Sequence, residues 1–552
     1  MPPPDLPLGG GKAPWIKDEG LWFMDEGLLP KHTSALLHSF HSYTPEVLSE
    51  LLNSRTPELL IRKYMKQKLL IILLAGSMLS ANAQEKQVHT LTLEQVIRMA
   101  QEKSPSAVSA RLNRESAEWS YRFYKANYLP SVTLTSNPSY ARSINKITQP
   151  DGTFKYLEQN SLSTDLNLSI QQNIALTGGT FSITSSLDRS DFFREGQDRE
   201  TSYSSRPIYI GYSQSLFGLN SLKWDRRIEP IAYREACKRY NETMELVASN
   251  ACSYFFNLAA AQVNAEIANF NYASADTLYR YAQGRYGIGT ITENEMLQLE
   301  INKLSEEANR IEAQFAVEDN MQALRSFLAL EDNVEIRVVP DDSVPHFTVS
   351  ADKALAMAYE HNPDPEYFKR ARLQSDRNVA NAKANAGLRA NIYLQFGLTQ
   401  TGPDVQAAYR DPINSQTASI TLSLPILDWG RGRGQVKMAR SNRELTYLNI
   451  NQSERDFQEN VFRIVRQFNQ QTAKMNIVAK TDITAERRFE VARRLYLMGK
   501  SSILDLNSAT SEKDAARRNH ITALRNYWSL YYTLRSLTGY DFERGKEIEW
   551  EK

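Results

Sequence analysis

The chain has 552 residues and an almost balanced charge, with 65 basic against 64 acidic side chains. A net charge of +1 provides no field that would attract nucleic acid, so we expect no nucleic-acid partner. The mean hydropathy of −0.48 excludes a membrane protein built from spanning helices. The 2 cysteines and 7 histidines lack the spacing of metal ligands, so the sequence predicts no metal site and no cofactor.

The segment 65–83 has the pattern of a secretory signal peptide. Lys66 and Lys68 form a basic start, an apolar run covers 69–79, and an Ala-Asn-Ala cleavage pattern ends at residue 83. The apolar run is too short to span a bilayer, which takes about 20 residues. Residues 65–83 are therefore predicted to be removed from the mature protein.

A signal peptide belongs at the start of a chain, but residues 1–64 precede this one. We expect translation to begin at Met65, with residues 1–64 a misassigned and disordered upstream extension. Mass spectrometry of the mature protein checks this, and an N-terminus before Met65 would contradict it.

Similar helical patterns open both halves of the remaining chain. Thr92 is placed to cap a helix whose apolar face holds Val96, Ile97 and Ala100. The same pattern returns at 354–358, 258 positions later, and a second helical pattern follows each copy. This recurrence predicts an internal repeat, which determines how the rest of the chain is interpreted.

Short segments of alternating apolar and polar residues come next, and they predict strands with one apolar and one wet face. Such strands form either a soluble sandwich or a membrane barrel with a polar lumen. With a signal peptide and long helices nearby, we favour the barrel. Four segments lie in the first half and two in the second: 131–135, 165–171, 181–187, 208–213, 392–398 and 419–424.

Two long helical stretches follow the strands. Pro230 is the only proline within 225–330, and 435–538 contains none. About 60 residues of helix span about 90 Å, wider than a globular core, so these helices must pack on one another. The glycine-rich segment 430–434 lacks the spacing of a phosphate-binding loop and is predicted to be a hinge between strand and helix.

A tip motif interrupts each long stretch and predicts a chain reversal into a shorter return helix. Each copy has a glycine, an isoleucine four positions on and an acid two positions later. The copies, 212 positions apart, are Gly287, Ile291 and Glu293, then Gly499, Ile503 and Asp505, with Gly289 as an additional glycine in the first.

The two spacings locate an insertion. Leading helices 258 positions apart and tips 212 positions apart make the first half longer by 46 positions. Leu216-Phe217 aligns with Ile426-Leu427 at a spacing of 210, so the excess lies before residue 216. We predict one surplus hairpin, at about Asp165 to Leu187.

The doubled order of helix, strands, long helix, tip and return helix resembles the TolC family of outer-membrane efflux proteins, from Leu91 to Tyr540. Residues 216–218 and 424–430 are similar to the family's strand-exit segments, and the two tip motifs are similar to its periplasmic tips. The resemblance implies a mixed α and β membrane protein, in which a trimeric outer-membrane β-barrel continues into a long periplasmic α-helical barrel. The implied divisions are a first repeat at 84–340, a second at 341–540 and a tail at 541–552.

The resemblance also implies the partners: two further copies in a homotrimer, outer-membrane lipid, a periplasmic adaptor protein and an inner-membrane pump. It assigns the helix-tip turns, with Gly287, Gly289, Ile291, Gly499 and Ile503, to adaptor docking.

The family's closed periplasmic entrance points to three residues of this chain, Asp505, Tyr496 and Glu293. Ser508 and Ser501 depart from the pattern, since a second acid and an arginine are common there, which puts a double acidic ring and the usual latch in doubt. A ring of Asp505 carboxylates would favour cations. Alternatively, the acids only stabilise helix N-termini through the helix dipole. The two roles are compatible.

These features predict a channel subunit of a tripartite efflux pump that exports small molecules passively. A type I protein secretion channel and a non-transport adhesive surface stalk remain the alternatives. The sequence contains no convergent acid pair, metal cluster or nucleophile that an enzyme would need, so we expect no catalytic residues.

Overall fold

The computed structural model describes residues 88–552, except 194–197, 332–334, 499, 549 and 551–552. The chain divides into two units, 1–85 and 86–552, and the described residues belong to the second. The upstream extension at 1–64 and the signal peptide at 65–83 therefore lie outside the described residues.

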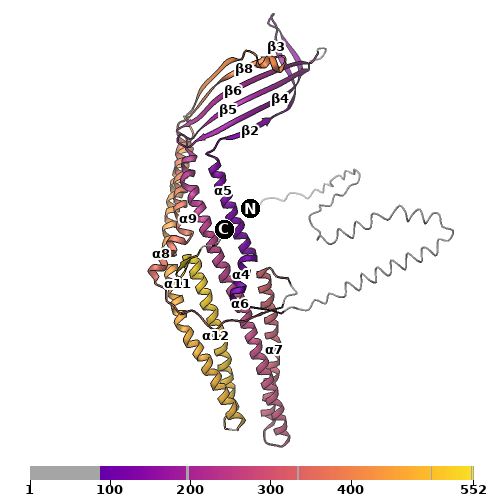
Figure 1. Ribbon diagram of the computed structural model, residues 1–552, viewed down its shortest axis with the longest axis vertical. Coiled ribbons are helices and arrows are strands. Elements are labelled where there is room, and N and C mark those ends of the chain that lie inside the picture. Colours follow the sequence, from indigo (N-terminus) through magenta and orange to yellow (C-terminus); the bar gives the residue numbers. More distant parts are fainter. Residues whose placement is uncertain (1–87, 194–197, 332–334, 499, 549, 551–552) are drawn as a thin grey trace, which may run out of the picture. The chain divides into compact units, whose positions relative to one another are not determined.

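The main sheet lies at one end of the second unit, and the long helices extend from it to the other end (Figure 1). The helices are α4 (Leu93–Lys103), α5 (Pro105–Ala126), α6 (Ser221–Gly287), α7 (Glu293–Leu328), α8 (Ala351–His361), α9 (Asp364–Ala386), α10 (Val405–Tyr409), α11 (Arg431–Leu497) and α12 (Ile503–Thr538). The strands are β1 (Val88–Leu91), β2 (Ser131–Ser136), β3 (Ser139–Thr148), β4 (Phe154–Ile174), β5 (Gly179–Phe193), β6 (Glu200–Leu216), β7 (Glu335–Val338), β8 (Arg389–Gly402), β9 (Ile413–Ser423), β10 (Tyr540–Asp541) and β11 (Lys546–Glu547).

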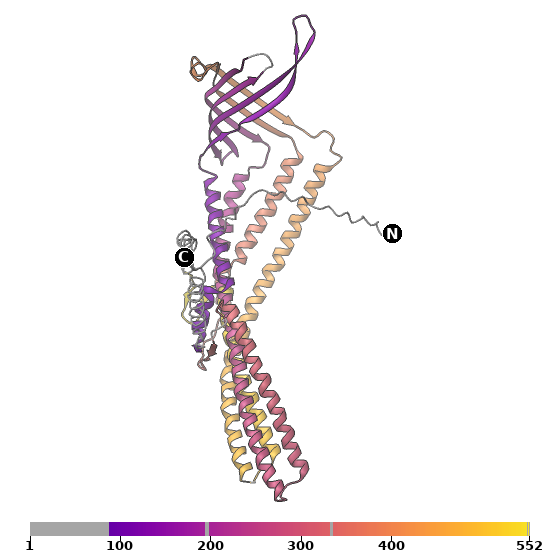
Figure 2. The same cartoon turned by 90° about the vertical axis from the view of Figure 1, so that its right-hand side faces the viewer.

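The predicted long helices are confirmed and have matching lengths in the two halves. Helices α6 and α11 have 67 residues each, and α7 and α12 have 36 each. At about 1.5 Å per residue, each 67-residue helix extends about 100 Å. Each long helix reverses into its shorter partner, and the two resulting hairpins lie side by side through contacts of α6 with α12 (Figure 2).

The helix bounds correct the spacing of the repeat. Helices α6 and α11 begin and end at an offset of 210 in residue number, and so do α7 and α12. The spacing of 212 that aligned Gly287 with Gly499 was wrong by two positions, because a glycine, one apolar residue and one acid form too loose a motif to fix a register. Gly289 corresponds by number to Gly499, and Glu293 to Ile503. Helices α4 and α8 start at an offset of 258, so the first half is longer by 48 positions.

The main sheet has the order β2-β4-β5-β6-β8-β9, and β3 also pairs with β4. Strands β2 and β3 keep one register along β4 and form a single line, which is interrupted at Asn137-Pro138. Proline has no N–H to donate to the ladder. The four strand lines of the first half and the two of the second agree with the sequence. The extension of β3 and β4 was missed, since Arg142, Lys146 and Glu158 interrupt the apolar alternation.

One face of this sheet is apolar and exposed, whereas the other carries hydroxyl and amide side chains. Val132 and Ile420 are each 67% exposed although both are aliphatic. The polar face includes Thr133, Gln171 and Ser182 at alternate positions. Further exposed members of the apolar face are Leu134, Leu166, Leu168, Ile170, Ile208, Ile210, Leu394, Phe396 and Leu422.

The largest hydrophobic core lies in the middle of the helical part, where α4, α8 and the parallel pair β1 and β7 pack on the long helices. Thr92 caps α4 as predicted, with its side chain accepting from the Gln95 N–H, and Val96 and Ala100 are fully buried. Fully buried aromatic side chains, including Phe468 and Tyr527, fill the centre.

A buried ion-pair network joins the end of the chain to this core. The Arg535 guanidinium donates to both carboxylate oxygens of Glu245, at 2.8 and 3.1 Å, and to Asp541 at 2.9 Å. Glu245 is 1% exposed, and burial raises the pKa of its carboxyl while Arg535 opposes the rise. Tyr531 donates to Asp541 at 3.1 Å. The residues expected to be only a tail therefore include a packed segment, with β10 pairing to β11.

Candidate functional site

The first tip joins α6 to α7 through a glycine turn. Gly289 has φ +73° and its N–H donates to the Tyr286 carbonyl at 2.9 Å. The Thr290 N–H donates to the Arg285 carbonyl at 2.9 Å. The left-handed conformation that ends this helix belongs to Gly289, which adopts it without steric conflict. The reversal assigned to Gly287 was therefore misplaced, since Gly287 is the last helical residue and lies outside the left-handed region.

A capping box starts α7. The Thr292 hydroxyl accepts from the Glu295 N–H at 3.3 Å, and the Glu295 carboxylate accepts from the Thr292 N–H at 3.1 Å. Glu293 is the exposed first residue of α7, where a negative charge suits the helix dipole. The capping acid of this tip is thus Glu295, two positions beyond the acid that the sequence motif indicated.

The second tip uses Asp505 itself as the capping acid of α12. The Ser502 hydroxyl accepts from the Asp505 N–H at 3.2 Å, while the Asp505 carboxylate accepts from the Ser502 N–H at 3.2 Å and the Ser501 hydroxyl at 3.1 Å. Hydrogen bonds from Ser502, then Ser501, hold the pKa of Asp505 below its usual range. Gly499 and the side chain of Ile503 lie outside the described residues.

Apolar side chains project from both tips into solvent. Ile288 is 76% exposed, Leu504 is 75% exposed and Met498 is 59% exposed, whereas Ile291 is half-buried. The exposed members offer more surface for docking than the isoleucine the motif singled out. The sequence analysis missed them because the periodicity of a helix does not extend through a turn.

Tyr496 packs within its own hairpin. It lies against a small cluster formed by Phe489, Leu506 and Ala509, on the last turn of α11. Tyr286, 210 positions earlier and at the same place on α6, is 42% exposed. The structure therefore places Tyr496 and Asp505 on the same hairpin, with Tyr496 filling the space between its helices.

A groove of about 1020 Å³ runs between the two hairpins. The Lys513 ammonium lies 4.3 Å from the ring centres of both Phe270 and Phe489. Beside it, the Asn271 amide donates to the Asp514 carboxylate at 2.8 Å. These contacts hold α6 to α12 above the tips. Adjacent lysine and aspartate residues in a helix usually indicate a solvated face, so no pattern in the sequence pointed to them.

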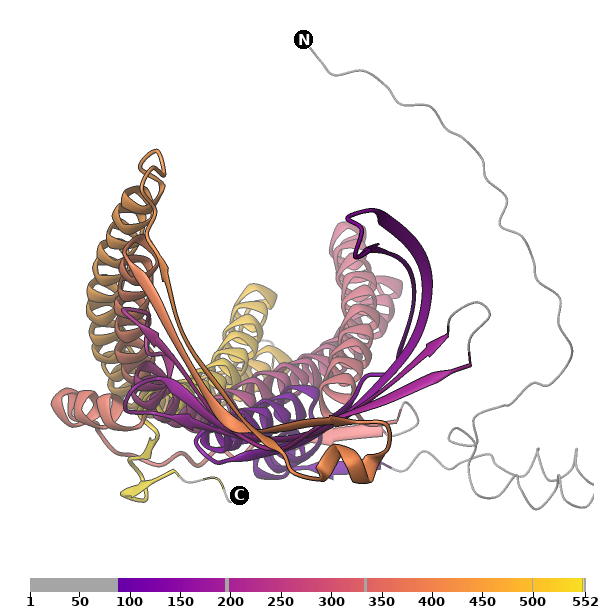
Figure 3. The ribbon, with the colours of Figure 1, turned by 90° about the horizontal axis from the view of Figure 1, so that it is seen from above.

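Near the sheet and toward the tips, both edges of the described part of this unit are open. Near the sheet the helices follow the neighbour order α5, α6, α9, α11, and toward the tips the order α7, α6, α12, α11. One edge consists of β2, α5 and α7, and the opposite edge consists of β9 and α11. Seen from above, the helices and the sheet of this unit follow an open arc (Figure 3).

Exposed apolar stripes line these edges. On α7, Phe315 is 67% exposed and Ile301 is 58% exposed. Five exposed apolar residues of α7, from Leu297 to Phe315, follow one another at intervals of four, three, seven and four positions. Such intervals are typical of a coiled-coil seam. The described residues of this chain leave these stripes uncovered on helices of 36 and 67 residues. The stripe residues are Leu297, Ile301, Leu304, Ile311 and Phe315 on α7, Trp119 and Phe123 on α5, and Met438, Leu445 and Leu448 on α11.

The segment 430–434 starts a helix. Gly430 has φ +82° and precedes α11, and the Asp428 carboxylate accepts from the N–H groups of Gly430 and Gly432 at 2.9 and 2.8 Å. The segment therefore connects the last strand of the sheet to α11, with Arg431 to Gly434 in the first turns of the helix. Its role as a hinge stays a prediction.

The described residues contain neither a membrane-spanning helix nor a cluster of metal ligands. Every helix in this part of the chain is too short or too polar to span a lipid bilayer. Across the same residues, no three histidine, cysteine or acidic side chains are grouped so as to hold a metal ion.

Residues 173–330 and 358–540 match the sequence profile of the family described as outer membrane efflux protein. No curated protein matches the chain significantly. The match covers both long hairpins, the tips and most of the sheet.

Solved outer membrane channels have a similar fold. The Campylobacter jejuni CmeC channel is 16% identical, with 83% of this chain and 87% of that chain covered and a TM-score of 0.60. The Neisseria gonorrhoeae MtrE channel in its open state is 15% identical, with 83% and 91% covered and a TM-score of 0.54. The Vibrio cholerae protein VceC is 14% identical, with 83% and 97% covered and a TM-score of 0.53. At these identities the likeness concerns the fold alone.

Proposed function

The chain belongs to the outer membrane efflux protein family, and on this premise we propose that it is one subunit of a homotrimeric channel for passive export. In this proposal the sheets of three copies close a barrel in the outer membrane. The helices continue it as a tunnel through the periplasm. The equal lengths of the paired helices support an origin by duplication of a half-chain.

The observation that carries the proposal is the pair of open edges beside an exposed apolar face. An edge strand with unpaired backbone groups is a template for another strand, and a closed barrel removes it. The β2 edge of one copy can pair with the β9 edge of the next, while the α7 stripe of one copy meets α11 of the next. Because the two edges differ, the contact is head-to-tail, and it ends only when the ring closes.

The tips would serve as the periplasmic end. We assign Ile288, Met498 and Leu504, with the glycine turn at Gly289, to docking of an adaptor protein that connects the channel to an inner-membrane pump. Asp505 and Glu293 would place carboxylates at the entrance. Asp505 both caps α12 and carries a charge that is retained at neutral pH, so the capping role and the charged-ring role remain compatible.

Membrane fractionation followed by planar-bilayer recording tests this function. We expect the mature protein in the outer membrane and discrete ion conductance from the purified oligomer. A soluble or non-conducting protein would contradict the channel and favour a surface stalk. If conductance is present but cells lacking the gene lose export of a protein and keep small-molecule resistance, the alternative of type I protein secretion is supported instead.

A further inference from the structure

We propose that the β4–β5 hairpin is a wall insert, which adds two strands per copy to the closed barrel and sets the width of the lumen in the membrane. This inference rests on the proposed function and deepens it. A lumen widened in this way suits bulky polar cargo, neutral or cationic. The surplus hairpin has three possible places, inside the lumen as a plug, outside the cell as a cap or within the wall, and the structure favours the last.

The pairing places the hairpin within the wall. Strand β4 pairs with β2 and β3 on one side and, from Asn160 to Ile174, with the whole of β5 on the other. Strand β5 in turn pairs with β6, with one irregularity between Thr184 and Ser186. A plug or a cap would leave β2 free to pair directly with β6. Here the two strands separate β2 from β6.

Both surfaces of the wall continue across the insert. On the apolar face, paired positions run from Val132 through Ile170 and Ile183 to Ile210 and Phe396. The insert therefore repeats the lipid-facing pattern of its neighbours. A segment folded into a water-filled lumen would have no need of an aliphatic face.

The polar face continues in the same way. On this face, paired positions run from Ser131 through Gln171 and Ser182 to Gly211 and Gln395. All five are small or polar, as expected for a surface that meets water. The insert therefore has one face for lipid and one for the lumen, as a strand within a barrel wall must.

The strand count gives the size of the effect. Six strand lines per copy give about 18 strands in a ring of three, against about 12 if each copy lacked β4 and β5. Strands about 4.8 Å apart and tilted by about 40° close a barrel with a backbone diameter of about 36 Å for 18 strands and about 24 Å for 12. Barrels of 16–18 strands enclose an aqueous channel.

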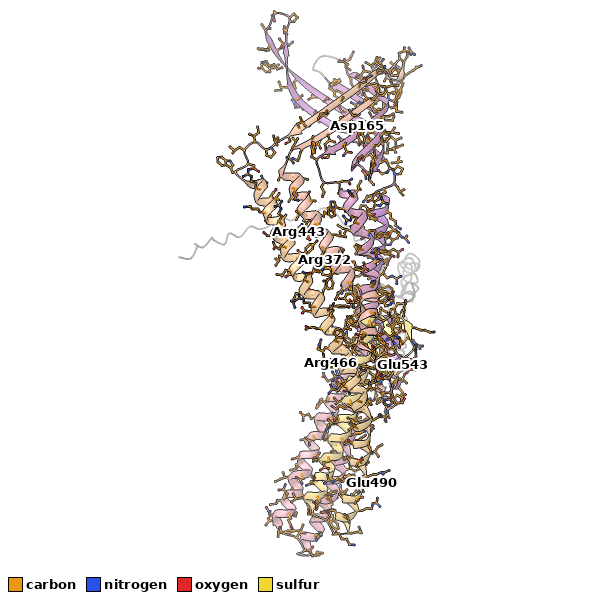
Figure 4. All side chains as sticks on the ribbon, turned by 90° about the vertical axis from the view of Figure 1, so that its left-hand side faces the viewer. Asp165, Arg372, Arg443, Arg466, Glu490 and Glu543 are labelled. Carbon is orange, nitrogen blue, oxygen red and sulfur yellow. The ribbon has the colours of Figure 1, made fainter. Side chains whose placement is uncertain are left out.

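The insert also changes the charge of the lumen. Asp165 and Asp188 are directly opposite on β4 and β5, on the same face as Gln171 and Ser182. Figure 4 shows Asp165 within the sheet, far from the helical tips. Directly opposed like charges destabilise a sheet unless water screens them. A water-filled lumen provides that screening, and the pair disfavours anionic cargo.

Deletion of residues 153–200 tests the proposal. This removes a segment as long as the excess of the first half and keeps the turn Gln149–Gly152 to join β3 to β6. The intact protein and the deletion variant are each purified as oligomers in lipid nanodiscs and imaged by electron cryomicroscopy. We expect a three-copy ring in each, with the backbone diameter of the sheet region reduced by about one third in the deletion variant. Equal diameters would overturn the wall insert.

The intact chain provides a second test in case the deletion variant does not fold. In a background with Cys237 and Cys252 replaced by alanine, Ile170→Cys and Gln171→Cys place neighbouring thiols on opposite faces of β4. A water-soluble maleimide should label Gln171→Cys at least about tenfold faster in nanodiscs, because lipid covers residue 170. Equal labelling would overturn the wall insert even when the oligomer is a conducting trimer. If the intact protein is not a ring, the proposed function itself fails, and the two failures are thus distinguishable.

Discussion

The middle of the helical part and its two ends differ in how completely one chain satisfies its own surfaces. In the middle, Phe468 and Tyr527 are fully buried and Arg535 is paired with two acids. At the sheet end and along the edges, Val132 and Phe315 are each 67% exposed. The difference fits the proposed channel: one copy completes its own middle, whereas its sheet and edges would acquire their partners only in the proposed assembly in the membrane.

This comparison can be tested by damaging each region and asking whether folding or assembly suffers. Damage to the middle should lower the stability of every copy. Damage to the edges should leave the fold intact and weaken the contacts between copies. Damage at the tips should leave the fold and the trimer intact and change local order, ion preference or adaptor docking.

The largest effect is expected in the middle, from Glu245→Ala. It leaves the Arg535 guanidinium buried with only Asp541 as a charged partner, which should destabilise the protein by about 3–5 kcal/mol. Denaturant unfolding in detergent measures the loss. The matched control is Glu94→Ala, whose exposed pair with Arg98 should contribute about 0–1 kcal/mol. Equal effects of the two variants would show that burial of the Glu245–Arg535 pair is not what stabilises the middle.

A smaller effect, confined to assembly, is expected from Phe315→Glu on the α7 stripe. Exposing instead of burying one such aromatic side chain forfeits about 1.5–3 kcal/mol at each contact between copies. Native mass spectrometry should show a shift from trimer to monomer with unchanged circular dichroism. Gln314→Glu, at an exposed neighbouring position off the stripe, should leave the trimer intact. Dissociation by both variants would show that added charge, and not the loss of the stripe, is responsible.

A local effect is expected from Ser502→Ala at the second tip. Loss of the N-cap should cost about 1 kcal/mol and expose the first turn of α12 to hydrogen exchange. Thr292→Ala should do the same for α7, since both tips have a capping box. Protection lost in only one of the two variants would show that the tips are not equivalent.

The smallest energetic effect concerns the charge of Asp505. Hydrogen bonds from Ser502 and Ser501 lower the pKa of this carboxyl, so it remains ionised at the ordinary aspartate pKa of about 3.9. Its capping contribution is present above that pH and is lost as the pH falls through the lowered pKa. Reversal potentials should therefore show cation preference at pH 4 that declines only under more acidic conditions.

Asp505→Asn is the direct comparison and should weaken cation preference at pH 7. Glu293→Gln is its counterpart at the first tip. Unchanged selectivity in Asp505→Asn would remove the charged-ring role and leave only the capping role.

The sequence predicted the long helices and the strand lines because the period of the apolar residues differs between a helix and a strand. The hairpin followed from the difference between the two repeat spacings. Val96 and Ala100 were assigned to a buried face from spacing alone, and both are fully buried. The pairing of Asp165 with Asp188 and of Leu166 with Leu187 agrees with the predicted hairpin.

The tips were predicted less well, since a turn of a few residues has no periodicity. The motif placed the reversal at Gly287 instead of Gly289, and it did not reveal that Glu295 forms the cap. The entrance role of Glu293 stays a prediction. The contacts of Lys513 with Phe270 and Phe489 could not be predicted, because they depend on how two distant hairpins pack.

Cross-linking of the two sheet edges tests the central claim most directly. Thr133→Cys on β2 is combined in one chain with single cysteines placed along 415–421 on β9, in a background without Cys237 and Cys252. If three copies close one barrel, a short bifunctional thiol reagent should join different chains and give dimer and trimer bands on a denaturing gel. Cross-links found only within single chains would show that each sheet closes on itself and would contradict the shared barrel.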